Sequence, residues 1–237
     1  DDIVPLARKI LATLAEPVEI GRQLLSVNTS LGIAVYPRDS ETADTLLQYA
    51  DTAMYRAKAS GGNAMVFFTP EMMQALTERL QLEAGLRRAI DAGELRLHFQ
   101  PIIEARSGRV VSAEALVRWQ DPGRGLVSPV DFIPIAEDTG LIVPIGDWVL
   151  REACTQACAW QELGLGSISV AVNLSVRQFA EPTLDDSVAR ALEASGCPAS
   201  LLHLEITESS IMDQVEQAMT TMYRLIALGV QLTIDDF

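Results

Sequence analysis

Acidic and amide side chains recur at the ends of apolar segments in the second half of the chain. Glu114 lies in one such segment, Asn173 and Glu205 lie in the next two, and Asp235-Asp236 closes the last. The final two intervals each fit one strand and one helix, and the first interval holds an additional helix. Because the carboxyl ends of parallel strands converge on one face of a barrel, we expect these side chains to meet there.

This set contains carboxylates and one amide but neither histidine nor cysteine. Such oxygen donors suit Mg²⁺ or Mn²⁺ better than Zn²⁺ or Cu²⁺. The adjacent Asp235 and Asp236 can serve two ions about 3.5–4 Å apart, an arrangement typical of phosphodiester cleavage. Taken singly, each acid is better explained as a solvated strand-end residue and Asn173 as a loop or cap residue. Their recurrence at equivalent positions favours a metal site.

The segment around the first acid holds opposite charges. In a strand with a period of two, Glu114, Leu116 and Arg118 share one face. A carboxylate beside a guanidinium is costly inside a barrel unless a cation and an anion are held there together. This pattern favours a site that binds a cation next to an anion.

Composition limits the classes of protein that fit. The chain has 237 residues, 49% of them hydrophobic, which predicts one or two domains with a sizeable core. No apolar run reaches the roughly 18–20 residues of a membrane span, so we expect no membrane contact from this segment and a cytoplasmic location, with any anchor of the parent protein upstream. A net charge of −14 argues against a nucleic-acid polymer as partner. An anionic substrate would need metal ions or a few arginines.

Apolar periodicity predicts the elements that position these residues. Helices are expected over residues 4–15, 45–59, 71–92, 128–138, 146–162, 185–195 and 215–228. Strands are expected over residues 18–20, 24–36, 65–68, 95–103, 110–119, 168–174, 201–207 and 230–234. Strands that alternate with helices predict a parallel α/β architecture.

Other notable residues have simple structural explanations. Cys154 and Cys158 lie one helical turn apart with no further zinc ligand near them in sequence, and three cysteines fit a reducing compartment. Packing or rim positions are expected for the remaining candidates, namely His98, His203, Trp148, Trp160 and the stretch Phe132–Glu137. Lys58 fits a favourable charge at a helix end at least as well as a phosphate contact.

The second half of the chain contains a series of short motifs: Gln100-Pro101-Ile102, Glu114-Ala115-Leu116-Val117-Arg118-Trp119, Phe132-Ile133-Pro134-Ile135-Ala136-Glu137, Asn173-Leu174-Ser175, Glu205-Ile206-Thr207-Glu208 and Asp235-Asp236-Phe237. In these motifs and in their order, it resembles the EAL family of cyclic-di-GMP phosphodiesterases. The resemblance implies a partial TIM-type (β/α) barrel whose first strand is antiparallel to the others. The connection between residues 103 and 110 is too short for a parallel crossover, which fits that topology.

The resemblance also implies roles for individual residues. The implied metal ligands are Glu114, Asn173, Glu205 and Asp235, with Asp236 associated with a second ion. Glu208 is implied as the anchor of the loop at the metal site, and the implied substrate contacts are Gln100, Leu116 and Arg118, the last on phosphate. The implied reaction is attack of a metal-activated water on cyclic-di-GMP, giving linear pGpG.

The first part of the chain contains the motifs Ser30-Leu31-Gly32-Ile33-Ala34-Val35-Tyr36-Pro37, Ala50-Asp51-Thr52-Ala53-Met54-Tyr55-Arg56-Ala57-Lys58 and Gly61-Gly62-Asn63. In these motifs it resembles the C-terminal half of a GGDEF (diguanylate cyclase) domain. Lys58 matches a phosphate-contacting lysine, whereas Gly62 stands where active cyclases carry a basic residue. We expect the C-terminal part of an α/β GGDEF domain over residues 1–69 and the N-terminal part of an EAL domain over residues 70–237, with 70–92 as connecting or first helix.

The sequence is compatible with three functions. We expect the parent protein to be a Mg²⁺- or Mn²⁺-dependent cyclic-di-GMP phosphodiesterase in bacterial second-messenger signalling. The alternative is a catalytically degenerate EAL domain that binds cyclic-di-GMP without cleaving it, or that binds a partner. A third possibility is a purely structural dimerisation module, since the family often dimerises. That function leaves the strand-end acids unexplained. The two histidines are isolated and form no His-Asp pair. This argues against an HD-type domain, the alternative that cleaves the same nucleotide. The chain supplies roughly five of eight barrel strands, and a catalytic lysine and further glutamates are expected beyond residue 237, so the isolated chain is expected to be inactive.

Overall fold

The computed structural model describes residues 2–21, 23–207 and 215–235, and it divides the chain into two compact units, residues 1–81 and 82–237. The first unit contains α1 (Ile3–Ala15), β1 (Val18–Ile20), β2 (Gln23–Leu25), β3 (Leu31–Ile33), α2 (Ala43–Ala59), β4 (Met65–Phe67) and the beginning of α3 (Pro70–Ala92). The predicted domain boundary after residue 69 stays a prediction.

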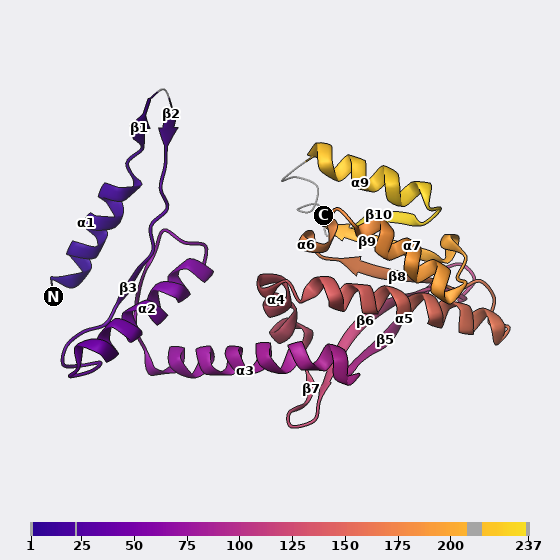
Figure 1. The fold of residues 1–237 in the computed structure, drawn as a ribbon, viewed down its shortest axis with the longest axis horizontal. Helices are drawn as coiled ribbons and strands as arrows, with labels where there is room; N and C mark the ends of the chain where they lie inside the picture. Colours follow the sequence, from indigo (N-terminus) through magenta and orange to yellow (C-terminus); the bar gives the residue numbers. More distant parts are fainter. Residues whose placement is uncertain (1, 22, 208–214, 236–237) are drawn as a thin grey trace. The chain divides into compact units, whose positions relative to one another are not determined.

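The first unit is built on one β–α–β arrangement. Strands β3 and β4 pair in parallel, and α2 connects them and packs on β3 (Figure 1). Gly32 allows the close approach, because a Cβ atom there would lie 1.8 Å from the carbonyl oxygen of Ala50. Lys58 is exposed in the last turn of α2, where a positive charge favours the helix.

The predicted strand over residues 24–36 was wrong, because the structure divides it into β2 and β3. The reason is a change of partner: β2 pairs antiparallel with β1, whereas β3 pairs in parallel with β4. Five residues, 26–30, carry the chain from one pairing to the other and belong to neither strand. Apolar pattern alone does not reveal which partner a strand will meet.

The second unit is a mixed α/β structure around one sheet. Its strands are β5 (Leu95–Ile103), β6 (Val110–Asp121), β7 (Gly125–Val127), β8 (Ser169–Leu174), β9 (Leu202–Thr207) and β10 (Gln231–Asp235). Its helices, besides the end of α3, are α4 (Pro129–Thr139), α5 (Ile142–Glu162), α6 (Val176–Phe179), α7 (Leu184–Ser195), the 3₁₀ turn η1 (Ala199–Leu201) and α9 (Val215–Ala227).

The sheet has the strand order β10-β9-β8-β6-β5, with β7 added on β6. Strands β6, β8, β9 and β10 are parallel, and β5 pairs antiparallel with β6. The expected antiparallel first strand is therefore confirmed. Helix α5 packs on β8 and on α7, α7 packs on α9, and α9 packs on β10, so these helices follow one another along the sheet (Figure 1).

The two faces of this sheet differ in character. In β9, Leu202, Leu204 and Ile206 are fully buried and alternate with half-buried polar residues. Matching apolar positions in β6 and β8 join the same hydrophobic core beneath the helices. Since successive strand residues point to opposite faces, the apolar residues of these strands pack against the helices and the polar residues lie on the other face.

The C-terminal end of β6 is anchored by one aromatic residue. Trp119 is fully buried, and its ring meets Phe132 of α4 edge-to-face with centroids 6.0 Å apart. Its indole N–H donates to Glu94 Oε2 at 3.1 Å. Burial of a Trp side chain contributes several kcal/mol, so this contact fixes the strand next to Arg118.

Candidate active site

Among the described residues, predicted site residues from four strands lie on the polar face of the sheet. Glu114 stands opposite Gln100 in the antiparallel pair of β6 with β5. Asn173 stands opposite Glu205 in the parallel pair of β8 with β9. Directly opposed residues in a sheet share a face, so four predicted residues from four strands are on one side.

Glu114 lies in the middle of β6 and not at its end. The strand continues to Asp121 because β5 and β7 still pair with it, whereas the pairing with β8 ends at Ala115 and Val172. Glu114 therefore lies next to the point at which the parallel sheet opens. Glu114 is therefore close to the end of the part of β6 that pairs with β8, as expected of an acid at a strand end. It is not at the end of β6 itself, which continues to Asp121.

The structure brings Glu114 and Asn173 into direct contact. Asn173 Nδ2 donates to Glu114 Oε1 at 2.7 Å, although the residues are far apart in sequence. This bond uses the amide nitrogen of Asn173, so its oxygen Oδ1 is the atom that can bind a cation. The chemistry of this pair fits a hard divalent ion.

The remaining acids of the predicted set are described only in part. Glu205 is half-buried and lies across from Asn173. The backbone of Asp235 pairs with Thr207 at the end of β10, next to β9. Glu208 and Asp236 lie outside the described residues. Among the described residues, no group of three or more His, Cys, Asp or Glu side chains is placed to hold a metal ion, so the full ligand set stays a prediction.

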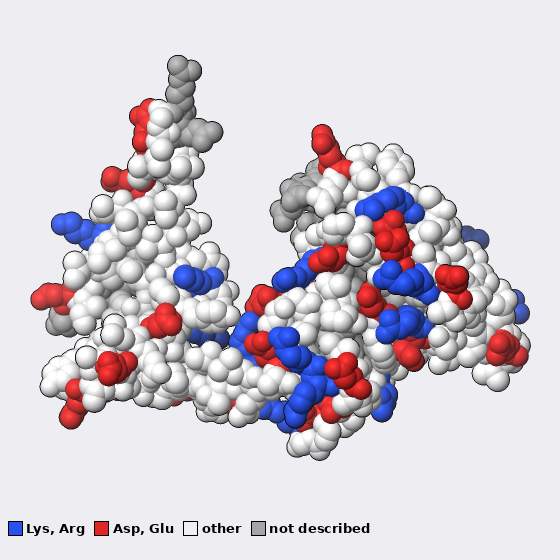
Figure 2. Space-filling model, in the orientation of Figure 1, with Lys and Arg blue, Asp and Glu red and all other residues white. Residues whose placement is uncertain are grey.

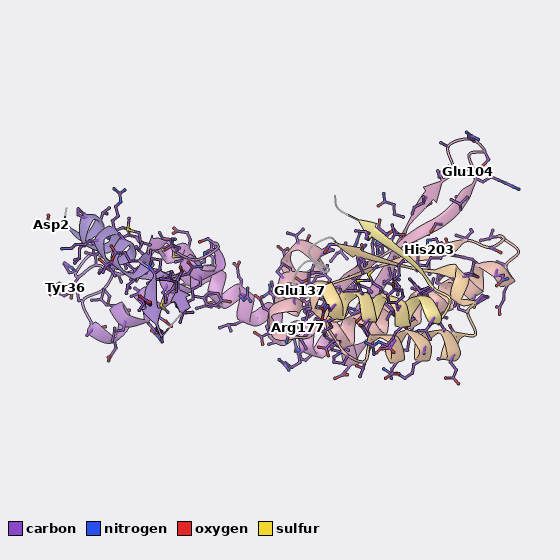
Figure 3. The ribbon with its side chains drawn as sticks, turned by 90° about the horizontal axis from the view of Figure 1, so that it is seen from above. Asp2, Tyr36, Glu104, Glu137, Arg177 and His203 are labelled. Carbon is purple, nitrogen blue, oxygen red and sulfur yellow. The ribbon has the colours of Figure 1, made fainter. Side chains whose placement is uncertain are left out.

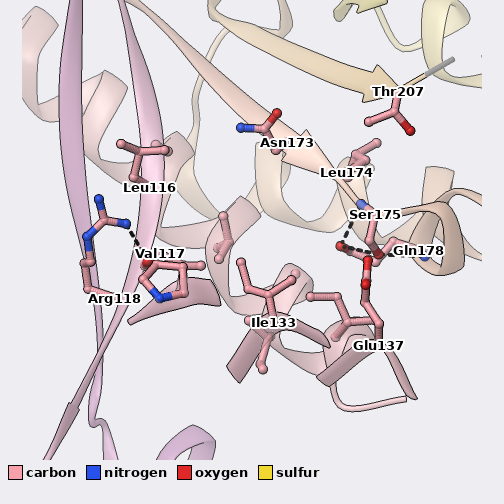
Figure 4. Close-up of a pocket in the computed structure, with 16 residues that line it drawn as sticks. Leu116, Val117, Arg118, Ile133, Glu137, Asn173, Leu174, Ser175, Gln178 and Thr207 are labelled. Atoms are coloured by element: carbon pink, nitrogen blue, oxygen red, sulfur yellow. Dashed lines mark hydrogen bonds between the residues drawn. The ribbon is translucent and has the colours of Figure 1, made fainter. Parts of the chain in front are cut away.

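A cavity of about 230 Å³ opens beside this pair. Leu116 and Arg118 line it from β6, Asn173 lines it from β8, and apolar side chains of α4 and α5 form a further part of its wall (Figure 4). Arg118 Nη1 donates to the carbonyl oxygen of Val117 at 2.8 Å, which holds its guanidinium at the rim. Gln100 is on the same sheet face but does not line the cavity.

Sequence reasoning missed two contributions to this cavity. Glu137, expected only to pack, lines it, and burial together with the neighbouring charge of Asp138 raises the pKa of its carboxyl group. Helix α6 was not predicted, yet Ser175 and Gln178 at its start line the cavity as well. The signal was available, because Ser-x-x-Gln is the pattern of a helix capping box.

Helix α6 is also tied to α4. Arg177 Nη1 donates to the carbonyl oxygen of Glu137 at 2.6 Å, at the end of α4. Figure 3 shows Glu137 and Arg177 close together at one end of the sheet, away from the β5–β6 hairpin that carries Glu104. The walls of the cavity are thus connected to each other.

The two histidines lie on the polar face. His203 is half-buried in β9, and burial lowers the pKa of its imidazole. His98 stands opposite Leu116 and is exposed. Trp148 and Trp160 are partly buried on α5, as expected for packing, and Trp160 contacts Phe99 edge-to-face at 5.0 Å between centroids.

The three cysteines gather at one place in the core, a grouping that their sequence positions did not reveal. Cys154 and Cys158 of α5 meet Cys197, which follows α7. Burial raises the pKa of Cys154 to about 11 and that of Cys197 to about 12, the latter also because the other two thiols are near. Protonated, buried thiols indicate packing.

Charge on one face of the second unit is mixed. Basic and acidic side chains are interspersed over the visible face of the second unit (Figure 2). Against a net charge of −14, an anionic ligand needs local cationic groups at its binding site. Within the described ranges, no helix is both long and apolar enough to cross a bilayer.

Comparison with known proteins places both units. The family profile "EAL domain" matches residues 83–237, and "Diguanylate cyclase, GGDEF domain" matches residues 1–64. The chain is 43% identical over 236 residues to the bifunctional diguanylate cyclase/cyclic di-GMP phosphodiesterase MucR of Pseudomonas aeruginosa, covering 100% of this chain and 34% of MucR. It is 40% identical over 232 residues to the cyclic di-GMP phosphodiesterase PdeR of Escherichia coli, covering 98% of this chain and 35% of PdeR.

Solved structures of a related phosphodiesterase and of an EAL domain also resemble this chain. The PaMucR phosphodiesterase in complex with c-di-GMP matches with a TM-score of 0.64 and 45% identity, over 66% of this chain and 64% of that one. The FimX EAL domain from Pseudomonas aeruginosa bound to c-di-GMP matches with a TM-score of 0.57 and 28% identity, over 66% and 62%. The chain spans about a third of the length of MucR and PdeR. With a family profile matched over well more than half of its residues, the chain belongs to the EAL domain family.

Proposed function

We propose that the protein containing this chain hydrolyses cyclic-di-GMP to linear pGpG with the help of Mg²⁺ or Mn²⁺. The observation that carries the proposal is the contact of Asn173 with Glu114, which joins two oxygen-donor side chains from different strands at the edge of a cavity. The names of the relatives MucR and PdeR support cyclic-di-GMP phosphodiesterase activity.

In this proposal each site residue has a role. The residues that would hold the metal are Glu114, Asn173, Glu205, Asp235 and Asp236, with Glu208 anchoring the neighbouring loop. The ion, when bound, would lower the pKa of a water molecule and neutralise charge on the phosphodiester. Arg118 would hold a phosphate oxygen, Leu116 and the apolar cavity would receive apolar surface of the nucleotide, and Gln100 would contact substrate from β5.

The wider assignments are part of the same proposal. Residues 1–69 would be the C-terminal part of a GGDEF domain and residues 70–237 the N-terminal part of the EAL domain. The protein would act in the cytoplasm, in second-messenger signalling, and homodimerise through the EAL domain.

The test is turnover of cyclic-di-GMP by the full-length protein, followed by chromatography of pGpG. Substitution Glu114→Gln should lower kcat by more than about 100-fold, because even outer-shell partners of a metal cost 10–100-fold when mutated. Excess EDTA should stop turnover, and Mn²⁺ should restore it. The control Glu104→Gln changes an exposed acid in the β5–β6 hairpin and should leave turnover unchanged.

Equal turnover by the wild type and Glu114→Gln would contradict the metal-site assignment. Binding of cyclic-di-GMP without turnover in the wild-type protein would instead identify a receptor, the second function considered from the sequence. Calorimetric titration with cyclic-di-GMP separates these outcomes.

A further inference from the structure

Gln178 is a buried polar residue that the proposed reaction does not use. Its side chain is 5% exposed, lies in the four-residue helix α6 directly after β8, and lines the cavity beside Asn173. A polar side chain is costly to bury unless it is hydrogen-bonded, so the partners of this amide account for its position.

The oxygen of Gln178 is occupied by Ser175. Ser175 Oγ accepts from the backbone N–H of Gln178 at 3.2 Å. The backbone N–H of Ser175 and its hydroxyl group both donate to Gln178 Oε1, at 3.3 and 3.1 Å (Figure 4). Ser175 is two residues after Asn173, and the intervening Leu174 is buried in the core. The backbone that carries Asn173 is therefore tied to the Gln178 amide.

The nitrogen end of the same amide rests on α5. A Cβ atom at Gly146 would lie 1.7 Å from Gln178 Nε2 and 2.6 Å from its Cδ. The side chain can occupy this place only because residue 146 has no side chain. Gln178 thus contacts α5 at Gly146 and is hydrogen-bonded to Ser175. The backbone connects Ser175 to Asn173, which is hydrogen-bonded to Glu114.

Helix α6 has a second tie that does not involve this amide. Arg177 donates to the carbonyl oxygens of Glu137 and Asp138, at 2.6 and 3.4 Å. Phe179 is buried in the core at 3% exposure. Loss of the Gln178 amide should therefore loosen the backbone at Asn173 without detaching α6.

We propose that Gln178 is a positioning residue, seated on Gly146, that fixes Asn173 in the orientation needed to bind the metal ion. This inference rests on the proposed function, because it concerns the same metal site. Residues that orient metal ligands typically alter metal affinity by 10–100-fold when mutated.

The first experiment measures Mn²⁺ affinity of the full-length protein by calorimetry, without nucleotide. Gln178→Ala and Ser175→Ala should each weaken Mn²⁺ binding by about 10-fold or more, and Ser175→Thr, which keeps the hydroxyl group, should retain wild-type affinity. The stability control is Val188→Ala, a fully buried position of α7 that does not line the cavity. It should lower Tm but leave Mn²⁺ affinity unchanged.

The second experiment is a double-mutant cycle between Gly146 and Gln178. Gly146→Ala should weaken Mn²⁺ binding in the wild-type background, because the new methyl group displaces the amide. In the Gln178→Ala background the same substitution should have little further effect, since nothing remains to be displaced.

The outcomes separate the two proposals. Wild-type Mn²⁺ affinity in Gln178→Ala, or additive effects in the cycle, would overturn the positioning role and leave the metal site standing. A wild-type protein that binds neither Mn²⁺ nor Mg²⁺ would overturn the proposed function and this inference with it.

Discussion

Arg118 is the cationic side chain from β6 that lines the cavity beside Asn173. If it holds a phosphate oxygen, Arg118→Ala should weaken binding of cyclic-di-GMP by roughly 10- to 100-fold, the usual value of a hydrogen bond to a charged group. Titration calorimetry of the full-length protein measures this change.

Arg96 provides the matched control for that substitution. It stands opposite Arg118 in the β5–β6 pair, but its Nη1 donates to the carbonyl oxygens of Gly93 and Leu95, both at 2.6 Å. Arg96→Ala should change the affinity by less than about threefold, the scale of a screened surface charge. Equal losses in both variants would assign the effect to general charge and not to a phosphate contact.

His203 should make stability depend on pH. Burial lowers its pKa in the folded state below the ordinary 6.5, so the unfolded state binds the proton more readily. The contribution of the neutral imidazole is fully present above the unfolded pKa and is lost as pH falls from about 6.5 toward the lower folded value. His203→Gln should remove this loss, as measured by urea unfolding at about pH 7.5 and 5.5.

The other histidine of the chain is the control. His98→Gln alters an exposed side chain on the same sheet face and should leave the wild-type pH dependence in place. If His203→Gln lost as much stability on acidification as the wild type does, burial of this imidazole would have no energetic consequence.

At the scale of elements, helix α4 ends at a residue with two constraints. Gly140 has φ 80°, and a Cβ atom there would lie 3.0 Å from Arg177 Nη2. Gly196, which ends α7, has φ 68° but no heavy atom within 4 Å of the corresponding position. Gly196→Ala should cost about 1 kcal/mol from backbone strain, and Gly140→Ala about 1 kcal/mol more because the Arg177 bond to α4 is disturbed. Chemical denaturation of both variants measures the difference; equal costs would mean that Arg177 moves aside freely.

How much could be predicted from the sequence varied between elements, for physical reasons. The alternation of Leu202, Leu204 and Ile206 with polar residues reports a half-buried strand, and β9 was predicted within one residue. Strand β6 runs beyond its predicted end because β7 pairs with it, and such pairing has no local signature. Helix α6 is too short to show a helical period of apolar residues, so its capping box was the sequence signal that could have predicted it.

The same distinction applies to the site. Oxygen donors on successive parallel strands were enough to predict that Glu114 and Asn173 would lie at the same face, and they are hydrogen-bonded. Glu137 and Gln178 escaped prediction because they reach the cavity from helices, where residue type says little about direction. Glu208 and Asp236 lie outside the described residues, so their placement stays a prediction.

At the scale of the whole molecule, the cysteine cluster should report global unfolding. Cys154 and Cys197 are buried and their pKa values are raised to about 11 and about 12, so few thiolates exist near pH 8. Neither should react with iodoacetamide in the folded protein, and both should react once denaturant unfolds it. Mass spectrometry of the labelled peptides at increasing urea provides the measurement. Labelling well below the unfolding transition would show that this part of the core opens by itself.

The division of the sheet into an apolar and a polar face has a consequence for evolution. Residues that hold the helices and residues that would carry the chemistry alternate along the same strands but share no side of the sheet. A substitution that abolishes catalysis on the polar face leaves the core intact, so it is not removed by loss of folding. A lineage of this architecture can give up hydrolysis in a single step and keep a folded nucleotide-binding surface, on which selection for a new role can act.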